Sequence, residues 1–124
     1  MLLNDFYTLK AVEATGADTY TAYIALNPAH EIFRGHFPDG PVTPGVCMMQ
    51  IIKEITQHVI NAPLTLQSAS NVKFTALINP EVNPNLRLNL ELQETEEGLV
   101  KVKNTSYFDE TVALKLSCIF IKNS

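Results

Sequence analysis

The sequence has few of the residues that mark several common classes of protein. It contains two cysteines, Cys47 and Cys118, and no tryptophan among its 124 residues. Two cysteines cannot build the framework of a disulfide-rich secreted domain, so we expect both to be reduced residues of the core. The 9 lysines and arginines are outnumbered by 13 aspartates and glutamates, which gives a formal net charge of −4. This balance argues against a general nucleic-acid binder, which needs a basic face.

Long hydrophobic segments are missing as well. No uninterrupted apolar stretch approaches the roughly 20 residues of a membrane span. The residues from Met1 to Lys10 lack a basic region followed by an apolar one, so we expect no secretory signal and a cytoplasmic protein. There is no repeat, low-complexity tract or linker, and a hydrophobic content of 46% is sufficient for one core. We therefore predict a single domain that spans residues 1–124.

The spacing of apolar residues predicts one helix among several strands. Strands are expected around residues 6–9 and over 19–26, 70–77, 86–92, 99–107 and 112–121, and a helix over 45–60. One long helix followed by an antiparallel meander predicts an α+β fold in which a sheet wraps around the helix. A strand as regular as 86–92, or another strand of the sheet, would be left with an open edge, so we expect at least a dimer.

The predicted helix is apolar nearly all round in its first two turns, from Val46 to Ile52, and has a polar side only from Lys53 onward. A helix that is hydrophobic on all sides is normally buried. We therefore expect sheet to enclose its N-terminal half. His58 falls on the polar side and is expected at the surface.

The segment that leads into this helix carries the strongest functional signal. It reads Gly35-His36-Phe37-Pro38 and then Pro41-Val42-Thr43-Pro44-Gly45-Val46. Prolines fix the backbone and glycines permit unusual conformations, so this is a shaped loop. Histidine is the side chain that exchanges protons near neutral pH. Here it is expected close to the free N–H groups of a helix start, which favour a polarised or negatively charged oxygen.

This ordered pattern resembles the 3-hydroxyacyl-[acyl carrier protein] dehydratases of fatty-acid synthesis, the FabZ/FabA-like family with a hot-dog fold. The family shares Gly-His-Phe-Pro, a short turn, Pro-Val-x-Pro-Gly-Val and an acidic residue on the helix that follows. A partial second match runs from Val72-Lys73-Phe74 to Pro80, where the family's Pro-Gly-Asp is replaced by Pro80-Glu81-Val82. The acidic position falls on Gln50. The resemblance implies an α+β hot-dog fold, interconversion of 3-hydroxyacyl and trans-2-enoyl thioesters, and sites at a dimer interface.

The resemblance also implies a role for each motif residue. His36 would remove the proton from C2 of the thioester, with the Val42 carbonyl fixing its tautomer. The Gly45 N–H would stabilise the charge on the thioester carbonyl. The family's acid delivers a proton to the departing 3-hydroxyl, whereas the amide of Gln50 only forms hydrogen bonds with it. General acid catalysis contributes about 100- to 10,000-fold, so dehydration is expected to be slow unless another group substitutes.

Three acidic residues are candidates for that substitution. Glu54 shares a helix face with Gln50, but one helical turn is ~5.4 Å of rise and the reach is long. Glu31 and Asp39 lie in or near the loop, and the sequence does not place them relative to the site.

Apolar residues around the motif are candidates for contact with the substrate. The resemblance places Phe37, Val42, Val46 and Met49 there. An acyl-chain tunnel and an ordinary core are both open interpretations for a wider apolar set: Phe33, Phe37, Met48, Met49 and Ile52.

Cofactors and partners follow from the same resemblance. No cofactor is expected, because the substrate is carried on the phosphopantetheine of acyl carrier protein or on coenzyme A. A metal site is not expected either, since His30, Glu31 and His36 lack the helical His-Glu-x-x-His spacing. Basic residues at Arg34, Lys53 and Lys73 either meet the acidic carrier or are simply solvated.

Gln50 leaves a second class of function open. The chain is either a dehydratase in its own right or a non-catalytic, thioester-binding half of a mixed hot-dog dimer. A hot-dog thioesterase is a third alternative, but the motif is the wrong one for that activity.

Overall fold

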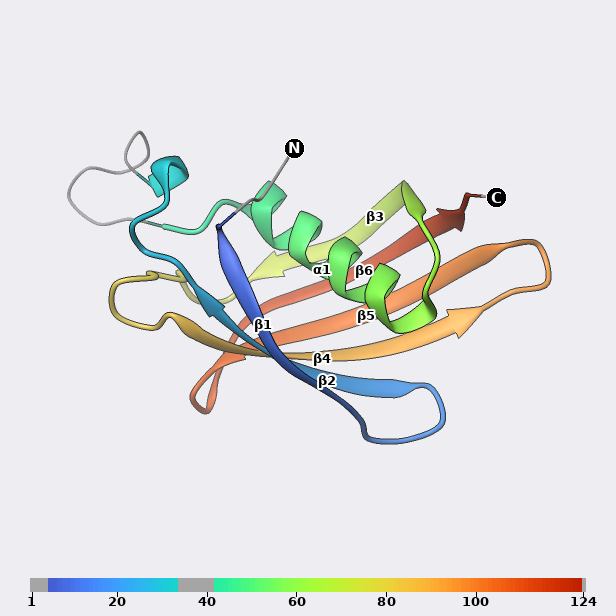
Figure 1. Cartoon of the computed structure of the whole chain (residues 1–124), viewed down its shortest axis with the longest axis horizontal. Coiled ribbons are helices and arrows are strands. Elements are labelled where there is room, and N and C mark those ends of the chain that lie inside the picture. The colour runs from blue at the N-terminus through green and yellow to red at the C-terminus, as the bar shows by residue number, and fades with distance from the viewer. Residues whose placement is uncertain (1–4, 34–41, 124) are drawn as a thin grey trace.

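The structure is a computed structural model that describes residues 5–33 and 42–123 (Figure 1). Within these residues, six strands form one antiparallel sheet in the order β1-β2-β4-β5-β6-β3. A short 3-10 helix, η1, and one α-helix, α1, complete the described part. The bounds are β1 Tyr7–Ala14, β2 Thr19–Leu26, η1 Glu31–Phe33, α1 Gly45–Ile60, β3 Leu64–Phe74, β4 Asn85–Glu94, β5 Leu99–Phe108 and β6 Thr111–Lys122.

Helix α1 lies across one face of the curved sheet, as Figure 1 shows. It begins directly after Pro44, whose ring suits a helix start, and runs over the predicted range. It ends at Asn61, which adopts the left-handed conformation (φ 55°, ψ 49°) and donates its N–H to the Gln57 carbonyl. The predicted α+β hot-dog arrangement, a sheet wrapped around one long helix, is therefore confirmed.

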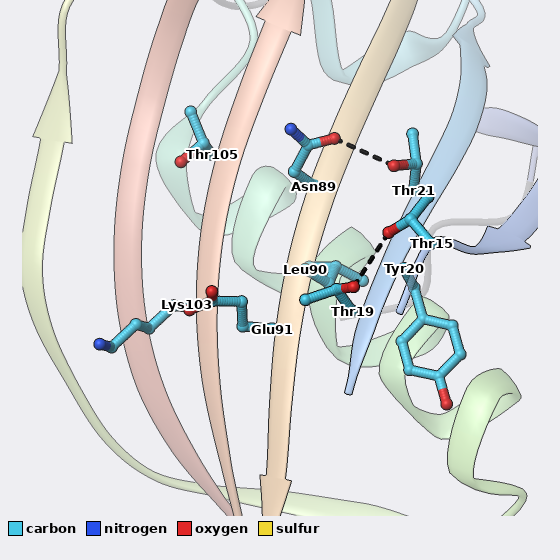
Figure 2. Close-up of a pocket in the computed structure, with 9 residues that line it drawn as sticks. All are labelled: Thr15, Thr19, Tyr20, Thr21, Asn89, Leu90, Glu91, Lys103 and Thr105. Carbon is cyan, nitrogen blue, oxygen red and sulfur yellow. Dashed lines mark hydrogen bonds between the residues drawn. The ribbon is translucent and has the colours of Figure 1, made fainter. Parts of the chain in front are cut away.

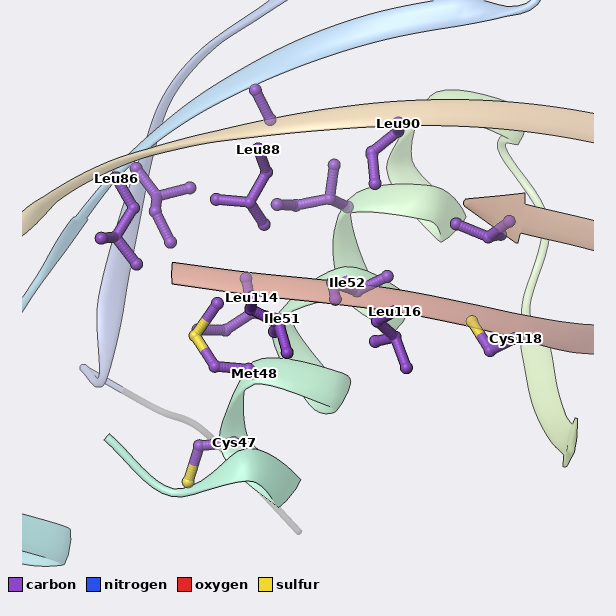
Figure 3. Close-up of a cluster of buried hydrophobic side chains, with 14 of the residues drawn as sticks. Cys47, Met48, Ile51, Ile52, Leu86, Leu88, Leu90, Leu114, Leu116 and Cys118 are labelled. Atoms are coloured by element: carbon purple, nitrogen blue, oxygen red, sulfur yellow. The ribbon is translucent and has the colours of Figure 1, made fainter. Parts of the chain in front are cut away.

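The core lies between α1 and the sheet (Figure 3). Met48, Ile51, Ile52 and Ile55 are fully buried on the helix. They pack against alternate residues of the strands, and burying each stabilises the fold by roughly 1.5–3 kcal/mol. The residues supplied by β4 and β6 are Leu86, Leu88, Leu90, Leu114, Leu116, Cys118 and Phe120.

Both cysteines are buried thiols, as predicted. Burial raises the pKa of the Cys118 thiol to about 11 and also raises the pKa of Cys47. Both thiols therefore stay neutral at physiological pH and behave as small apolar residues of the core.

The first turns of α1 are buried on the sheet side only, which corrects the expectation of full enclosure. Val46 is 64% exposed, and Met49 and Gln50 are half-buried. The sheet covers one side of a helix, so the opposite side of α1 is left without a covering layer in the described part of this single chain.

The open edges of the sheet belong to strands other than residues 86–92, the alternative that the prediction had left open. The regular strand at residues 86–92 belongs to β4, which lies between β2 and β5 and has no free edge. The edge strands are β1 and β3. Strand β3 begins at Leu64, six residues before the predicted start, and ends at Phe74. The prediction missed the start because residues 67–71 are mostly small or polar, and a bulge with Asn71 at φ 54° interrupts the alternation.

Candidate functional site

The start of α1 presents backbone N–H groups next to the sequence motif. Pro44 is the N-cap and makes no side-chain capping bond, while its carbonyl accepts from the N–H groups of Cys47 (3.1 Å) and Met48 (3.2 Å). The N–H of Gly45 precedes these bonds and has no intrahelical acceptor. This N–H, at the positive end of the helix dipole, is therefore suited to a polarised carbonyl oxygen.

Phe74 of β3 packs closely against Gly45. A Cβ atom placed on Gly45 would lie 3.2 Å from Cε2 of Phe74, which is tighter than most real contacts. Phe74 faces the same side of the sheet as buried Leu114, its register partner on β6. Sequence reasoning did not include Phe74 in the site, although its place in the partial Val72-Lys73-Phe74 match was the available signal.

The residues before the helix are fixed to the turn after β3. The N–H of Thr43 donates to the Ile78 carbonyl at 2.8 Å, which fixes the approach of the chain to Gly45. Val42 is half-buried beside it. The Thr43 hydroxyl is buried and has no hydrogen-bond partner among the described residues. No pattern in the sequence predicts that this polar group is buried next to the helix start.

Gln50 belongs to a chain of polar contacts on the open side of α1. Its Nε2 donates to Oε2 of Glu54 at 3.0 Å, and the Tyr7 hydroxyl donates to Oε1 of the same carboxyl group at 2.8 Å. Burial, followed by the hydrogen bond and the charge of Glu54, raises the pKa of Tyr7 well above that of a free tyrosine. Glu54 therefore reaches the Gln50 amide, and the rise of one turn does not separate the two side chains.

The other predicted residues fall into three groups. His36 and Phe37 lie outside the described residues, as do Arg34 and Asp39. Val46 is exposed and Met49 half-buried, both near the helix start. The remaining candidates for a tunnel are buried in the core of the described chain: Phe33, Met48 and Ile52.

Nothing in the described ranges suggests a metal centre. No cluster of three or more histidine, cysteine, aspartate or glutamate side chains occurs within residues 5–33 and 42–123. His30 accepts the N–H of Ile32 at its Nδ1 and meets the Phe6 ring edge-on, which is a structural role. His58 is exposed, as predicted. Across the same ranges, no helix is both long and apolar enough to cross a membrane.

A large hollow lies on the face of the sheet away from α1 (Figure 2). It measures about 610 Å³ and is lined by polar side chains of β2, β4 and β5, among them Thr21, Asn89 and Lys103. Thr21 donates its hydroxyl to Oδ1 of Asn89 at 3.2 Å. None of the residues predicted for the site lines this hollow, so it is separate from the candidate site.

Comparison with known proteins agrees with the motif. The family model of the ApeI-like proteins, described as ApeI dehydratase, matches residues 12–113. Two similar proteins are 3-hydroxyacyl-[acyl-carrier-protein] dehydratases FabZ. The one from Psychrobacter arcticus is 25% identical over 115 residues, which are 85% of this chain and 77% of that protein. The one from Lactobacillus helveticus is 26% identical over 98 residues, 73% of this chain and 65% of that protein.

Solved structures share the fold. A chain of the dehydratase heterocomplex ApeI:P from Xenorhabdus doucetiae has a TM-score of 0.74 and 23% identity, over 92% of this chain and 96% of that one. Cj0977, a sigma28-regulated virulence protein of Campylobacter jejuni, has a TM-score of 0.71 at 10% identity and covers all of this chain and 88% of that one. At sequence identities of 23% and 10%, the similarity of these two structures to this chain shows a shared fold and nothing more.

Proposed function

Since the chain belongs to the ApeI-like dehydratase family, we propose that it binds 3-hydroxyacyl and trans-2-enoyl thioesters and takes part in their interconversion. The observation that carries this proposal is the placement of Gly45 and Gln50. Among the described residues, Gly45 lies at a helix start without a side-chain cap, and Gln50 lies on the side of the same helix that the sheet does not cover. The Gly-His-Phe-Pro motif precedes this helix in the sequence.

The proposed chemistry divides into two halves. In the first, His36 takes the C2 proton, and the Gly45 N–H stabilises the negative charge that moves onto the thioester oxygen. In the second, the C2 electron pair forms the double bond with C3, the C3–O bond breaks, and the leaving oxygen requires a proton. A carboxamide does not supply one. We infer that this chain retains the base half and lacks the acid half.

A mixed dimer would complete the missing half. In the family, the histidine and the acid of one site come from different subunits. A homodimer of this chain would pair His36 with Gln50 at both sites. Pairing with an acid-bearing relative would create one site with His36 opposite a true carboxyl group. The heterocomplex ApeI:P, a fold neighbour of this chain, supports the mixed dimer as the second candidate.

Strand β3 is the proposed edge for either dimer. It is 11 residues long, and its outer edge is unpaired within the described chain. It exposes Leu66 (40%), Val72 (53%) and Phe74 (40%), and the last of these touches the helix start. The other edge strand, β1, exposes two charges, Lys10 and Glu13, whereas β3 exposes one, Lys73, and charges on an edge strand discourage pairing. A partner strand on β3 would therefore bring a second subunit to Gly45.

The proposed substrate carrier is an anionic group, the phosphopantetheine of a carrier protein or coenzyme A, and no resident cofactor is required. Lys73 of β3 lies directly opposite Lys115 of β6 on the outer face of the sheet. Like charges in this position repel each other. A phosphate or acidic partner would offset that repulsion close to Phe74.

The test is an assay of the purified chain with a 3-hydroxyacyl carrier thioester, followed by mass spectrometry for loss of water. It is run alone and with a co-purified, acid-bearing hot-dog partner, and repeated with His36→Ala in this chain only. Turnover that needs both chains and is abolished by His36→Ala supports the mixed dimer. Ordinary enzyme rates for the homodimer make the mixed dimer unnecessary. Absence of both binding and turnover in every combination contradicts the proposed function.

A further inference from the structure

The contacts between Tyr7, Gln50 and Glu54 have no counterpart in the motif that identifies the family. Tyr7 lies at the start of the edge strand β1, whereas Gln50 and Glu54 lie one turn apart on α1. All three side chains are half-buried. The contacts are short, and each oxygen of the Glu54 carboxyl group receives one donor.

The chemistry of the three groups fixes how the Gln50 amide is turned. An ionised carboxylate only accepts hydrogen bonds, so the side of the amide that faces Glu54 must be its nitrogen. The amide oxygen then lies on the other side of the amide carbon. Burial, followed by the hydrogen bond and the charge of Glu54, raises the pKa of Tyr7, so that the phenol keeps its proton and remains a donor.

We propose that Glu54, anchored by Tyr7, is a positioning residue that makes Gln50 present its carbonyl oxygen to the 3-hydroxyl of the substrate. This inference rests on the proposed function, since it concerns the same thioester site. The hydroxyl would donate its own proton to Gln50 instead of receiving one. Such a site holds a 3-hydroxyacyl group and does not expel hydroxide, which suits a subunit that binds substrate more than it dehydrates it.

Binding of two matched probes tests this proposal. We expect wild-type protein to bind 3-hydroxyhexanoyl pantetheine about fivefold more tightly than hexanoyl pantetheine, as one hydrogen bond predicts. Glu54→Leu removes the acceptor that turns the amide, and the preference should fall to near unity. Glu91→Gln, on the exposed face of β4, is the control and should keep it. If Glu54→Leu folds and retains the full preference, the proposal is overturned.

The side-chain amide of Gln50 offers a readout that needs no substrate. In a nitrogen-15 NMR spectrum, we expect the Hε proton of Gln50 that is hydrogen-bonded to the Glu54 carboxylate to be shifted downfield. Glu54→Leu, or Glu54→Met if the leucine variant does not fold, should return it to the position of a free amide. An unshifted resonance in the wild type, or one that ignores both variants, contradicts the proposal. If the Gln50 resonance responds to the Glu54 variants but neither pantetheine thioester binds, the proposed function is wrong, whereas the positioning of Gln50 by Glu54 stands.

An exchange of the two groups tests the same contacts. The double variant combines Gln50→Glu with Glu54→Gln. The amide now at position 54 donates from its nitrogen to the carboxyl group at position 50 and accepts from Tyr7 at its oxygen, so both hydrogen bonds survive. The hydrogen bond to position 50 favours the ionised carboxylate, which has no proton to give, whereas the single variant Gln50→Glu sets two carboxyl groups against each other and favours a shared proton. We expect the exchange variant to dehydrate 3-hydroxyhexanoyl pantetheine several times more slowly than the single variant. Equal rates, or the reverse order, would mean that Glu54 does not position residue 50.

Discussion

Replacing Tyr7 with phenylalanine is expected to destabilise the protein by about 1 kcal/mol. The change removes a 2.8 Å hydrogen bond to a carboxylate and keeps the ring. Hydrogen bonds to charged groups contribute roughly 1.5–3 kcal/mol. We take a value below this range because both partners are half-buried, so water replaces part of the bond, and Glu54 keeps its second donor, Gln50. One kcal/mol corresponds to a fall of about 4 °C in Tm for a chain of this size.

The assay is urea denaturation at several pH values, with Tyr20→Phe as the control. Tyr20 is half-buried on β2, and its hydroxyl has no side-chain hydrogen bond among the described residues. The pKa of Tyr7 is raised in the folded state. The protonated hydroxyl therefore contributes fully to the free energy of unfolding below about pH 10, and this contribution is lost as the pH rises further. The gap between wild type and Tyr7→Phe should therefore shrink above that pH. A difference in the free energy of unfolding below about 0.3 kcal/mol at neutral pH would mean that the hydrogen bond from Tyr7 to Glu54 does not stabilise the fold. A difference that is unchanged in alkali would mean the same.

Three further predictions concern the helix start and the open edge. Gln50→Glu should raise turnover at least tenfold, because it restores an acid. Unchanged turnover would mean that a residue at position 50 does not protonate the leaving oxygen. Gly45→Ala should change the free energy of unfolding, measured by denaturation, by less than about 1 kcal/mol, because the half-exposed Phe74 can shift. The same variant should bind the thioester more weakly, as calorimetry would measure. Val72→Lys on β3 should reduce the mass measured by light scattering to that of a monomer, whereas Ala11→Lys on β1 should not.

Local signals in the sequence were sufficient for the helix and for most strands. Pro44 and the apolar spacing after it defined the start of α1, and strict alternation defined β4. The strand β3 was misplaced because its early residues are small or polar, and its pairing with β6 is decided by the long-range register from Leu64 to Lys122. The pairing of β3 with β6 therefore decided where the strand begins, although the local residues have a low propensity for strands.

The candidate site was only partly predictable for a related reason. Gln50 and Glu54 are four residues apart on one helix, so their proximity follows from helical geometry. Tyr7 is 47 residues away from Glu54, and no pattern in the sequence links the two. The contact of Phe74 with Gly45 likewise depends on how β3 crosses the helix start. The predicted roles of His36, Gly45 and Gln50 remain predictions.

Hydrogen exchange at C2 of the substrate tests most directly the claim that the base half is intact and the acid half is missing. The purified chain is incubated in deuterium oxide with a 3-hydroxyacyl carrier thioester, and mass spectrometry follows deuterium at C2 and loss of water together. We expect deuterium to be incorporated at C2 faster than water is lost, and His36→Ala to abolish this incorporation. No exchange in the wild type, or exchange that is unaffected by His36→Ala, would contradict the account.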